Sequence, residues 1–424
     1  MKKYLGILLA AIVGGMVWAG VVAVGATEGW WRSPIAADED IKGFWAAGVG
    51  AISERSNGNA AFVLIKQNQI YDEHYSSVGR AVDRDTLFQV ASLSKWVSAW
   101  GVLSLVDAGL LDLDAPVSRY LTRWHLPPSD YDNSGVTVRR LLSHTAGLTD
   151  DLGYGGFLPG GEVQSLEESL TKASDASPGK TGVVKVGMQP GVAYRYSGGG
   201  YTLLQLIVEE VSRMSFNDYM RDHVFKPLGM TRSTYITDGL PASDIAEIYD
   251  QDGSYATHYK FTSLAATSLY TSAQDMVTFI NAHFPLNDRS AGRGVLTPET
   301  VALMRQPHAS QAGADIWGLG TVLYAPNNKG DFIVGHDGKN EPAINTTARF
   351  DPASGDGIVI LETGNALLAT ELAGEWTFWR TGNVDLFDFL AGMGQMIKAI
   401  LLGWLVITAM AVFWSYRVYR ARRS

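Results

Sequence analysis

The chain has 424 residues, enough for one large core or two smaller ones, and its 46% hydrophobic and 18% charged residues are ordinary for a globular protein. Its net charge of −9, with no Lys/Arg-rich stripe inside the body, argues against nucleic acid as a partner. The chain has no cysteine, which excludes disulfides, thiol catalysis and cysteine–zinc sites.

The first apolar segment, residues 4–26, follows Lys2 and Lys3 and carries no charge of its own. It predicts a transmembrane anchor or an uncleaved signal, although residues 24–26 also satisfy the small-residue rule for signal cleavage. Residues 27–40 are expected to form a linker. The body, residues 41–380, opens with a predicted helix over residues 41–55.

Two β-prone runs, residues 60–66 and 70–75, are separated by three polar residues and predict a hairpin. After it, an apolar run beginning at Leu87 changes to helical spacing. Large apolar residues then recur every three or four positions between Trp96 and Val106, which marks one face of a helix.

Ser92 and Lys95 fall on the first turn of this predicted helix, three residues apart and so on one face. The amide of Ser92 is free to bind a developing oxyanion, because first-turn N–H groups have no partner within the helix. Burial and the helix dipole favour a neutral Lys95, a base that activates the hydroxyl. A capping serine beside a solvated lysine is the alternative, since S-x-x-K also begins at Ser169 and at Ser177.

The middle of the body is predicted to be mainly helical. Residues 112–120 are expected to form a loop followed by a short helix, and residues 137–142 begin a helix that ends near residues 143–147. Further helices are expected over residues 166–173, 201–212, 216–224 and 270–284, the last entered through a Thr-Ser cap. Residues 149–190 are rich in glycine and serine. We interpret them as a mobile surface excursion that lines the cleft.

The last third of the body returns to strands, predicted over residues 318–324, 331–334, 344–350 and 357–362. Strands therefore lie at both ends of the body and helices between them. This order predicts an α+β fold in which the terminal segments share one sheet and a helical region is inserted.

A second apolar run, residues 389–414, precedes a basic tail, residues 415–424. The part after Lys398 would reach roughly 24 Å as a helix, short of a bilayer core of about 30 Å. A transmembrane helix therefore requires Lys398 to extend to the interface or to face protein; a helix on the membrane surface is the alternative. Positive charge lies outside both runs and acidic residues lie inside, which predicts cytoplasmic termini and an extracytoplasmic body at the cell membrane.

Three phrases resemble the serine β-lactamase-related hydrolases, the superfamily of class C β-lactamases, D,D-peptidases and related esterases. They are FQVASLSKWVSAWGVLSLVDAGLLDLDAPVSRYL, VTVRRLLSHTAGL and PGVAYRYSGGGYTLLQLIVEEVS, and the likeness runs from about residue 60 to residue 364. The resemblance implies a β-lactamase/penicillin-binding-protein-like antiparallel sheet flanked by helices, to which the two ends add transmembrane helices.

The resemblance implies that Ser92 is the nucleophile, Lys95 its base and Tyr196 the tyrosine of a Tyr-x-Asn motif that relays protons. Gly198 stands where that motif carries asparagine. The missing amide would contact the lysine and the acylamino group of β-lactams and D-Ala-D-Ala peptides, a buried contact of about 1–3 kcal/mol. We therefore expect hydrolysis of esters or other amides rather than β-lactamase or transpeptidase activity.

The third motif of the family, Lys-Thr-Gly or His-x-Gly on an edge strand, is matched by His336 and Gly338. The resemblance then implies that the backbone N–H of Lys339 joins that of Ser92 in the oxyanion hole. His336 would assist Tyr196 or meet a substrate carboxylate.

Other assignments of the motifs exist. Residues 180–182 and 131–133 spell the third and second motifs literally, but in polar, turn-like sequence and in an order contrary to the family's. His144 with Asp150 or Asp151 would make a Ser–His–Asp set, although its phrase is structural in the family. The sequence has no G-x-S-x-G elbow and no H-E-x-x-H cluster, so neither an α/β-hydrolase nor a metal site is expected.

We therefore predict a membrane-anchored serine hydrolase that cleaves an ester or amide bond in a small molecule or peptide through an acyl-enzyme on Ser92, without cofactor or metal. The lipid bilayer is its other expected partner. The competing hypothesis is a non-turnover, penicillin-binding-type sensor or binder of cell-wall peptides, whose signal crosses the membrane through the anchors.

Overall fold

An antiparallel sheet lies at the centre of the structure, a computed structural model that describes residues 2–150 and 153–423. Its strand order is β2-β1-β12-β11-β10-β9-β8-β7, and the pairs β3–β6 and β4–β5 lie outside it. The strands are β1 (Ala60–Lys66), β2 (Gln69–Ser76), β3 (Phe88–Gln89), β4 (Ile248–Tyr249), β5 (Tyr255–Ala256), β6 (Tyr270–Thr271), β7 (Ala309–Gln311), β8 (Ala314–Trp317), β9 (Val322–Pro326), β10 (Phe332–Asn340), β11 (Ile344–Phe350) and β12 (Gly357–Thr363).

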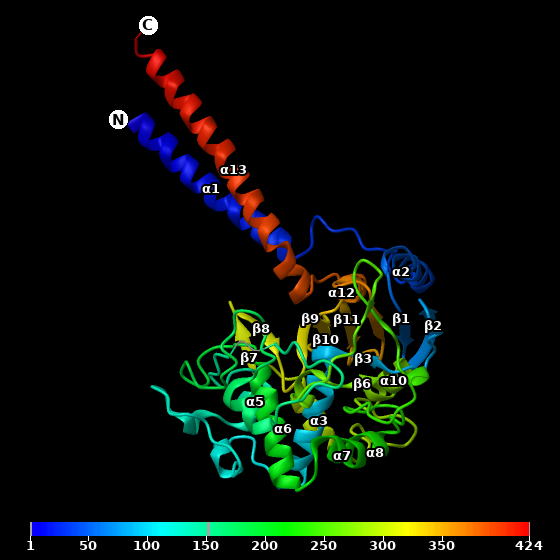
Figure 1. Cartoon of the computed structure of the whole chain (residues 1–424). Helices are drawn as coiled ribbons and strands as arrows, with labels where there is room; N and C mark the ends of the chain where they lie inside the picture. Colours follow the sequence, from blue (N-terminus) through cyan, green and yellow to red (C-terminus); the bar gives the residue numbers. More distant parts are fainter. Residues whose placement is uncertain (1, 151–152, 424) are drawn as a thin grey trace.

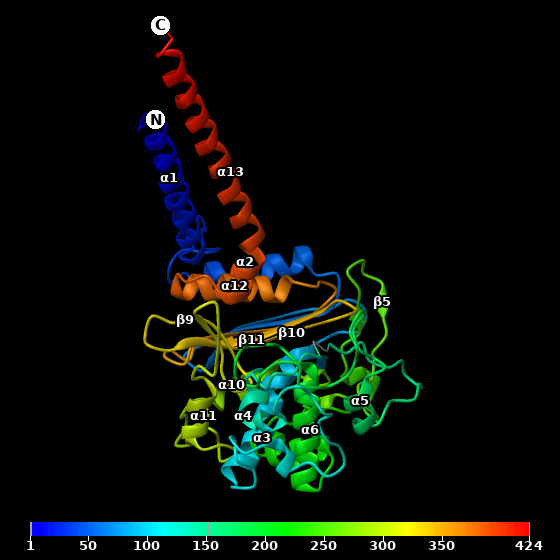
Figure 2. The same ribbon diagram turned by 90° about the vertical axis from the view of Figure 1, so that its left-hand side faces the viewer.

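Helices cover both faces of the large sheet: α2 and α12 lie on one face, and α3, α6 and α10 lie on the other (Figure 2). A 3₁₀ turn, η1 (Ala91–Leu93), precedes α3. The helices are α1 (Lys2–Thr27), α2 (Ile41–Arg55), α3 (Ser94–Asp107), α4 (Val138–Leu142), α5 (Leu166–Lys172), α6 (Gly198–Ser212), α7 (Phe216–Met220), α8 (Lys226–Leu228), α9 (Leu264–Thr267), α10 (Ala273–Asn281), α11 (Pro298–Met304), α12 (Leu368–Thr381) and α13 (Leu386–Arg420).

Strands β1 and β12 pair next to the edge strand β2, although they come from opposite ends of the body. Phe62 and Leu64 of β1 belong to the apolar cluster under α2 and α12, whereas Ala61 and Val63 belong to the larger core around α3. Both faces of β1 are therefore buried, which explains its continuous apolar run. The pairing confirms the predicted α+β fold, with one sheet shared by the ends of the body and helices inserted.

Most predicted elements are present, and the differences have local causes. The bounds of α2 and β11 agree with the prediction. Helix α6 begins at Gly198, before the predicted start at residue 201, because the Ser197 hydroxyl accepts the N–H of Gly200 and caps the helix. The predicted helix over residues 270–284 is shorter, since β6 occupies its first two residues and α10 begins after the Ser272 cap.

The described part of residues 149–190 is packed against the body to a greater extent than a surface excursion would be. Leu170 and Val184 are fully buried, and α5 lies against α6. Helix α5 corresponds to the helical segment predicted at residues 166–173.

Helices α1 and α13 extend side by side from the body, and both chain ends lie at the far end of this pair (Figure 1; Figure 2). The indole N–H of Trp18 donates to the carbonyl oxygen of Ala399 at 3.0 Å, and that of Trp404 donates to Gly15 at 2.9 Å. Both helices are long and apolar enough to cross a membrane. Helix α13 extends beyond the predicted run at both ends, and its 35 residues reach about 52 Å.

Candidate active site

Ser92 lies at a sharp turn between a strand and a helix. Strand β3 ends at Gln89, η1 follows, and α3 begins at Ser94. Ala91 has a φ of +46°, which residues with a Cβ rarely adopt, and the Ser94 hydroxyl donates to its carbonyl oxygen at 2.5 Å. The turn presents Ser92 one helical turn before Lys95, close to the predicted arrangement.

Lys95 is buried beside Ser92, with 2% of its surface exposed, because α3 is enclosed on almost every side. Its Nζ lies 3.0 Å from Ser92 Oγ and donates to the carbonyl oxygen of Ala266 on α9 at 2.7 Å. Burial lowers the pKa of Lys95 to about 7, although the charge of Asp150 acts in the opposite direction. Much of the amine is therefore uncharged at neutral pH and can accept the hydroxyl proton.

Tyr196 completes the group around Ser92. Its ring centre lies 5.0 Å from the Lys95 nitrogen, and its side chain is hydrogen-bonded with Ser92. Burial raises the pKa of Tyr196 above its ordinary value, and the hydrogen bond to Ser92 offsets only part of that rise. The phenol is therefore protonated at neutral pH, so it can donate a proton but is not the initial base.

His144 supports Tyr196 from behind. The two ring centres lie 4.4 Å apart, and His144 Nδ1 accepts the N–H of Ser197 at 3.1 Å. Asp150 accepts from the Ser197 hydroxyl at 2.6 Å and from the Gly199 N–H at 3.0 Å, so it caps α6. These contacts are those of a scaffold around Tyr196, not of a Ser–His–Asp set; Asp151, the other carboxylate considered, lies outside the described residues.

Strand β10 brings the third predicted motif next to η1. Strand β9 pairs with β10 from Phe332 to Gly335, and the later part of β10 lies against η1. A Cβ at Gly338 would lie 2.0 Å from the carbonyl oxygen of Val90, so this close approach requires glycine. The approach brings Lys339 to the same pocket as Ser92.

His336 is almost fully buried and packs edge-on against Trp317. Its Nδ1 lies 2.6 Å from the carbonyl oxygen of Asp337 and must donate to it, which leaves Nε2 unprotonated and, among the described residues, without a hydrogen-bond partner. Burial, with the charge of Lys95, lowers the pKa of His336 to about 4. The imidazole is therefore neutral at pH 7.

A pocket of about 250 Å³ lies in front of these groups. Its lining contains four of the six predicted site residues, namely Ser92, Lys95, Tyr196 and Lys339, whereas His336 and Gly338 lie outside the lining that the described residues form. The remaining lining residues are Gly153, Tyr154, Ser177, Thr267, Asn340 and Glu341.

The first three of these additional residues come from the Gly/Ser-rich stretch, which was expected to line the cleft. Asn340 and Glu341 directly follow Lys339, so an extension of the third motif by two residues would have found them. Thr267 ends α9, a four-residue helix that leaves no readable period in the sequence. Only the folded chain places it at the pocket.

Among the described residues, none of the other copies of the motifs brings a complete set of side chains to this pocket. Tyr131 is 40% exposed, Lys180 is exposed, and Ser169 is buried in α5. Ser177 lines the pocket, but its S-x-x-K partner is the exposed Lys180. Within residues 2–150 and 153–423, no group of three His, Asp or Glu side chains could hold a metal ion.

A family model described as Beta-lactamase matches residues 38–374. Penicillin-binding protein 4 of Amycolatopsis lactamdurans is 29% identical over 322 residues, which cover 71% of this chain and 80% of that protein. The octameric penicillin-binding protein homologue from Pyrococcus abyssi has a TM-score of 0.64 at 24% identity, with 79% of this chain and 76% of that chain covered. The D-amino acid amidase from Ochrobactrum anthropi SV3 has a TM-score of 0.59 at 20% identity, with 85% and 98% covered. The two structural likenesses show the fold alone.

Proposed function

The chain belongs to the beta-lactamase family, and from this premise we propose that it is a membrane-anchored serine hydrolase that cleaves an ester or amide bond through a covalent acyl-enzyme on Ser92. The observation that carries the proposal is the 3.0 Å contact between the Lys95 nitrogen and the Ser92 hydroxyl oxygen. A serine hydroxyl needs a neighbouring base, and a buried lysine whose pKa is near 7 is such a base.

In the acylation step, Ser92 Oγ attacks the carbonyl carbon while its proton moves to neutral Lys95. The carbonyl oxygen gains negative charge, which the backbone N–H groups of Ser92 and Lys339 stabilise. The bond to the leaving group then breaks, and the leaving alkoxide or amine takes a proton from the Tyr196 phenol. The proton held by Lys95 restores that phenol.

In the deacylation step, water attacks the acyl carbon while Tyr196 takes a proton from the water and passes its own to Lys95. The acyl–Oγ bond then breaks, and the proton held by Lys95 returns to Ser92 Oγ, so both side chains regain their starting state. His336 is neutral and its Nε2 can only accept a hydrogen bond. This state favours support of Tyr196 over the binding of a substrate carboxylate. We therefore propose that His336, Gly338 and Lys339 together form the side of the substrate-binding site that β10 provides.

The substrate we propose is an ester or amide without an acylamino group, because Gly198 stands at the asparagine position of the second motif. The same glycine, together with the penicillin-binding name of a relative, supports a second candidate: a binder that is acylated at Ser92 but does not turn over. Repeated turnover of p-nitrophenyl acetate by the full chain would favour the hydrolase. Release of one equivalent of p-nitrophenol followed by no further product would favour the binder.

The proposed membrane topology places both termini in the cytoplasm and the body outside. It is supported by two apolar helices that leave one side of the body together and by basic residues beyond both apolar runs. We expect a reporter that works only in the cytoplasm to be active when it is fused to the C-terminus, and a reporter that works only outside the cytoplasm to be inactive there. Activity of that reporter only in its extracytoplasmic form would reject the topology.

The test of the chemistry is labelling of Ser92 by a fluorophosphonate or a fluorescent penicillin. We expect Ser92→Ala to abolish the label, because no other hydroxyl in the pocket has a neutral lysine within 3.0 Å among the described contacts. Ser169→Ala is the matched control, since Ser169 belongs to another S-x-x-K copy and is buried in α5. Undiminished labelling of Ser92→Ala would reject the assignment.

A further inference from the structure

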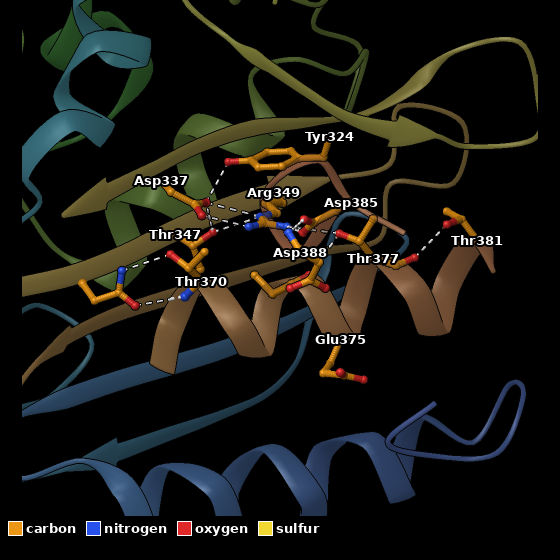
Figure 3. Close-up of polar contacts among 12 residues, drawn as sticks. Tyr324, Asp337, Thr347, Arg349, Thr370, Glu375, Thr377, Thr381, Asp385 and Asp388 are labelled. Atoms are coloured by element: carbon orange, nitrogen blue, oxygen red, sulfur yellow. Dashed lines mark hydrogen bonds and ion pairs between the residues drawn. The ribbon is translucent and has the colours of Figure 1, made fainter. Parts of the chain in front are cut away.

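A fully buried arginine, Arg349 on β11, lies between β10, the strand that carries the third motif, and the start of α13. It makes ion pairs with Asp337 on β10 and with Asp385, and both carboxylates are themselves almost fully buried (Figure 3). Its guanidinium carbon lies 3.7 Å from the ring centre of Tyr324 on β9. The three charged groups therefore join two neighbouring strands of the sheet to the residue that caps α13.

Asp337 is the middle residue of the third motif, between His336 and Gly338. Its carboxylate accepts from Arg349 Nη2 at 2.8 Å, from the Tyr324 hydroxyl at 2.7 Å and from the Thr347 hydroxyl at 2.5 Å. These side-chain contacts come from β9 and β11 and hold β10 on both sides, beyond the point where the pairing with β9 stops at Gly335. They fix the strand segment whose other side lies against Val90.

Asp385 connects the same arginine to the membrane helix. One of its oxygens accepts the N–H of Asp388 at 2.7 Å and caps α13, and the other is paired with Arg349. Arg32, which follows α1, pairs with Asp388 at 2.5 Å and with Glu375 on α12 at 2.6 Å. Arg32 therefore ties the end of α1 to α12 and to the first turn of α13, the turn that is capped by the partner of Arg349.

We propose that Arg349 is a positioning residue for the oxyanion edge of β10, which it holds through Asp337, and that Asp385 in turn holds Arg349, so that the first turn of α13 is required for full turnover. The proposal rests on the proposed function of Ser92. Its physical basis is that a buried ion pair stripped of one partner leaves an uncompensated charge, which moves toward a new partner or toward water. Movement of Arg349 releases Asp337 and with it the backbone of Lys339.

The test uses the full chain in detergent micelles and compares Asp385→Asn with Glu375→Gln. Asparagine keeps the shape of Asp385 and remains a good helix cap, but it removes the charge that faces Arg349. We expect Asp385→Asn to slow acylation of Ser92 by a fluorophosphonate about 10- to 100-fold, the range for a small misplacement of catalytic groups, while KM for an ester changes much less. Glu375→Gln, which touches Arg32 and not Arg349, should label like wild type, and Asp385→Glu should recover most of the rate.

Amide hydrogen exchange of residues 336–340 supplies a second readout that does not need activity. It should be faster in Asp385→Asn than in Glu375→Gln or wild type. Unchanged labelling together with unchanged exchange in Asp385→Asn would overturn the positioning role while leaving the hydrolase proposal intact. If Ser92 of the wild type is not labelled, the hydrolase proposal is rejected. Hydrogen exchange of residues 336–340 still tests whether Asp385 holds β10 in place. If Asp385→Asn does not fold, Arg349→Lys replaces it in the same comparison with Glu375→Gln. Lysine keeps the positive charge but lacks the planar guanidinium that pairs with two carboxylates at once.

Discussion

The carbonyl oxygen of Ala266 lies 2.7 Å from the Lys95 nitrogen and holds the amine against Ser92. A neutral amine has one lone pair and two N–H bonds. When one N–H is directed to Ala266, the lone pair can point to the hydroxyl of Ser92, which is the orientation that proton transfer needs. The short helix α9 therefore orients the Lys95 amine, although its sequence carries no motif.

This arrangement predicts how activity depends on pH. The pKa of Lys95 is lowered to about 7, and only the neutral amine accepts the Ser92 proton. As pH falls below 7 the amine becomes charged, so kcat/KM should drop about tenfold per pH unit. The measurement is kcat/KM for p-nitrophenyl acetate from about pH 5 to about pH 9. A flat profile across neutrality would contradict a lysine base.

Removal of the Asp150 charge should move this profile. The Asp150 carboxylate raises the pKa of Lys95, against the larger lowering effect of burial. In Asp150→Asn the raising effect is lost, so the pKa of Lys95 falls further and the rising limb of kcat/KM moves to lower pH. Asp132→Asn is the control, because Asp132 is an exposed cap of a distant turn. A shift to higher pH in Asp150→Asn would contradict the assignment of that limb to Lys95.

The local part of the site could be predicted from the sequence, because it depends on spacing within one helix. Ser92 and Lys95 are three residues apart, and any helix that begins there brings them together. The sheet shared by both ends of the body was also predictable, since β1 and β12 are continuous apolar runs. Tyr196 required the family phrases, because a tyrosine beside other aromatic residues is equally consistent with core packing.

The remaining contacts depend on tertiary structure that has no signal in the sequence. Ala266 acts through its backbone, so its side chain gives no hint of the role. Arg349 and Asp337 lie on neighbouring strands, where the register pairs Asp337 with Thr347 and leaves Arg349 as its diagonal neighbour. An isolated charged residue in a strand pattern predicts an exposed face rather than a buried pair. Helix α12, which covers this pair, was not predicted at all.

Gly338 gives a prediction about the close approach of β10 to η1. In Gly338→Ala the new Cβ would lie 2.0 Å from the carbonyl oxygen of Val90, a backbone atom that cannot rotate away. We expect a loss of about 1–3 kcal/mol in the free energy of unfolding and a marked fall in Ser92 labelling. Thermal unfolding and labelling rates provide the measurements.

Gly50→Ala is the matched control for this substitution. Gly50 lies in helix α2, and a Cβ there would meet no atom within 4 Å. Alanine should therefore stabilise the helix by about 0.5–1 kcal/mol and leave labelling unchanged. If Gly338→Ala and Gly50→Ala have equal effects on stability and on labelling, the close contact between β10 and η1 is not needed for either property.

The packing of α1 against α13 can be tested by cross-linking, since the chain has no cysteine of its own. A Cβ at Gly14 would lie 4.0 Å from the Cγ2 and Cδ1 atoms of Ile407, so cysteines at these two positions are within reach of a short bifunctional thiol reagent. We expect Gly14→Cys with Ile407→Cys to form an intramolecular cross-link in isolated membranes, seen as a mobility change under non-reducing conditions. Gly20→Cys with Ile407→Cys should form none, because a Cβ at Gly20 has no neighbour within 4 Å among the described residues. If the control pair cross-links as well as the first pair, α1 and α13 slide past each other and cannot hold Arg32 and Asp385 in a fixed relation at the base of the body.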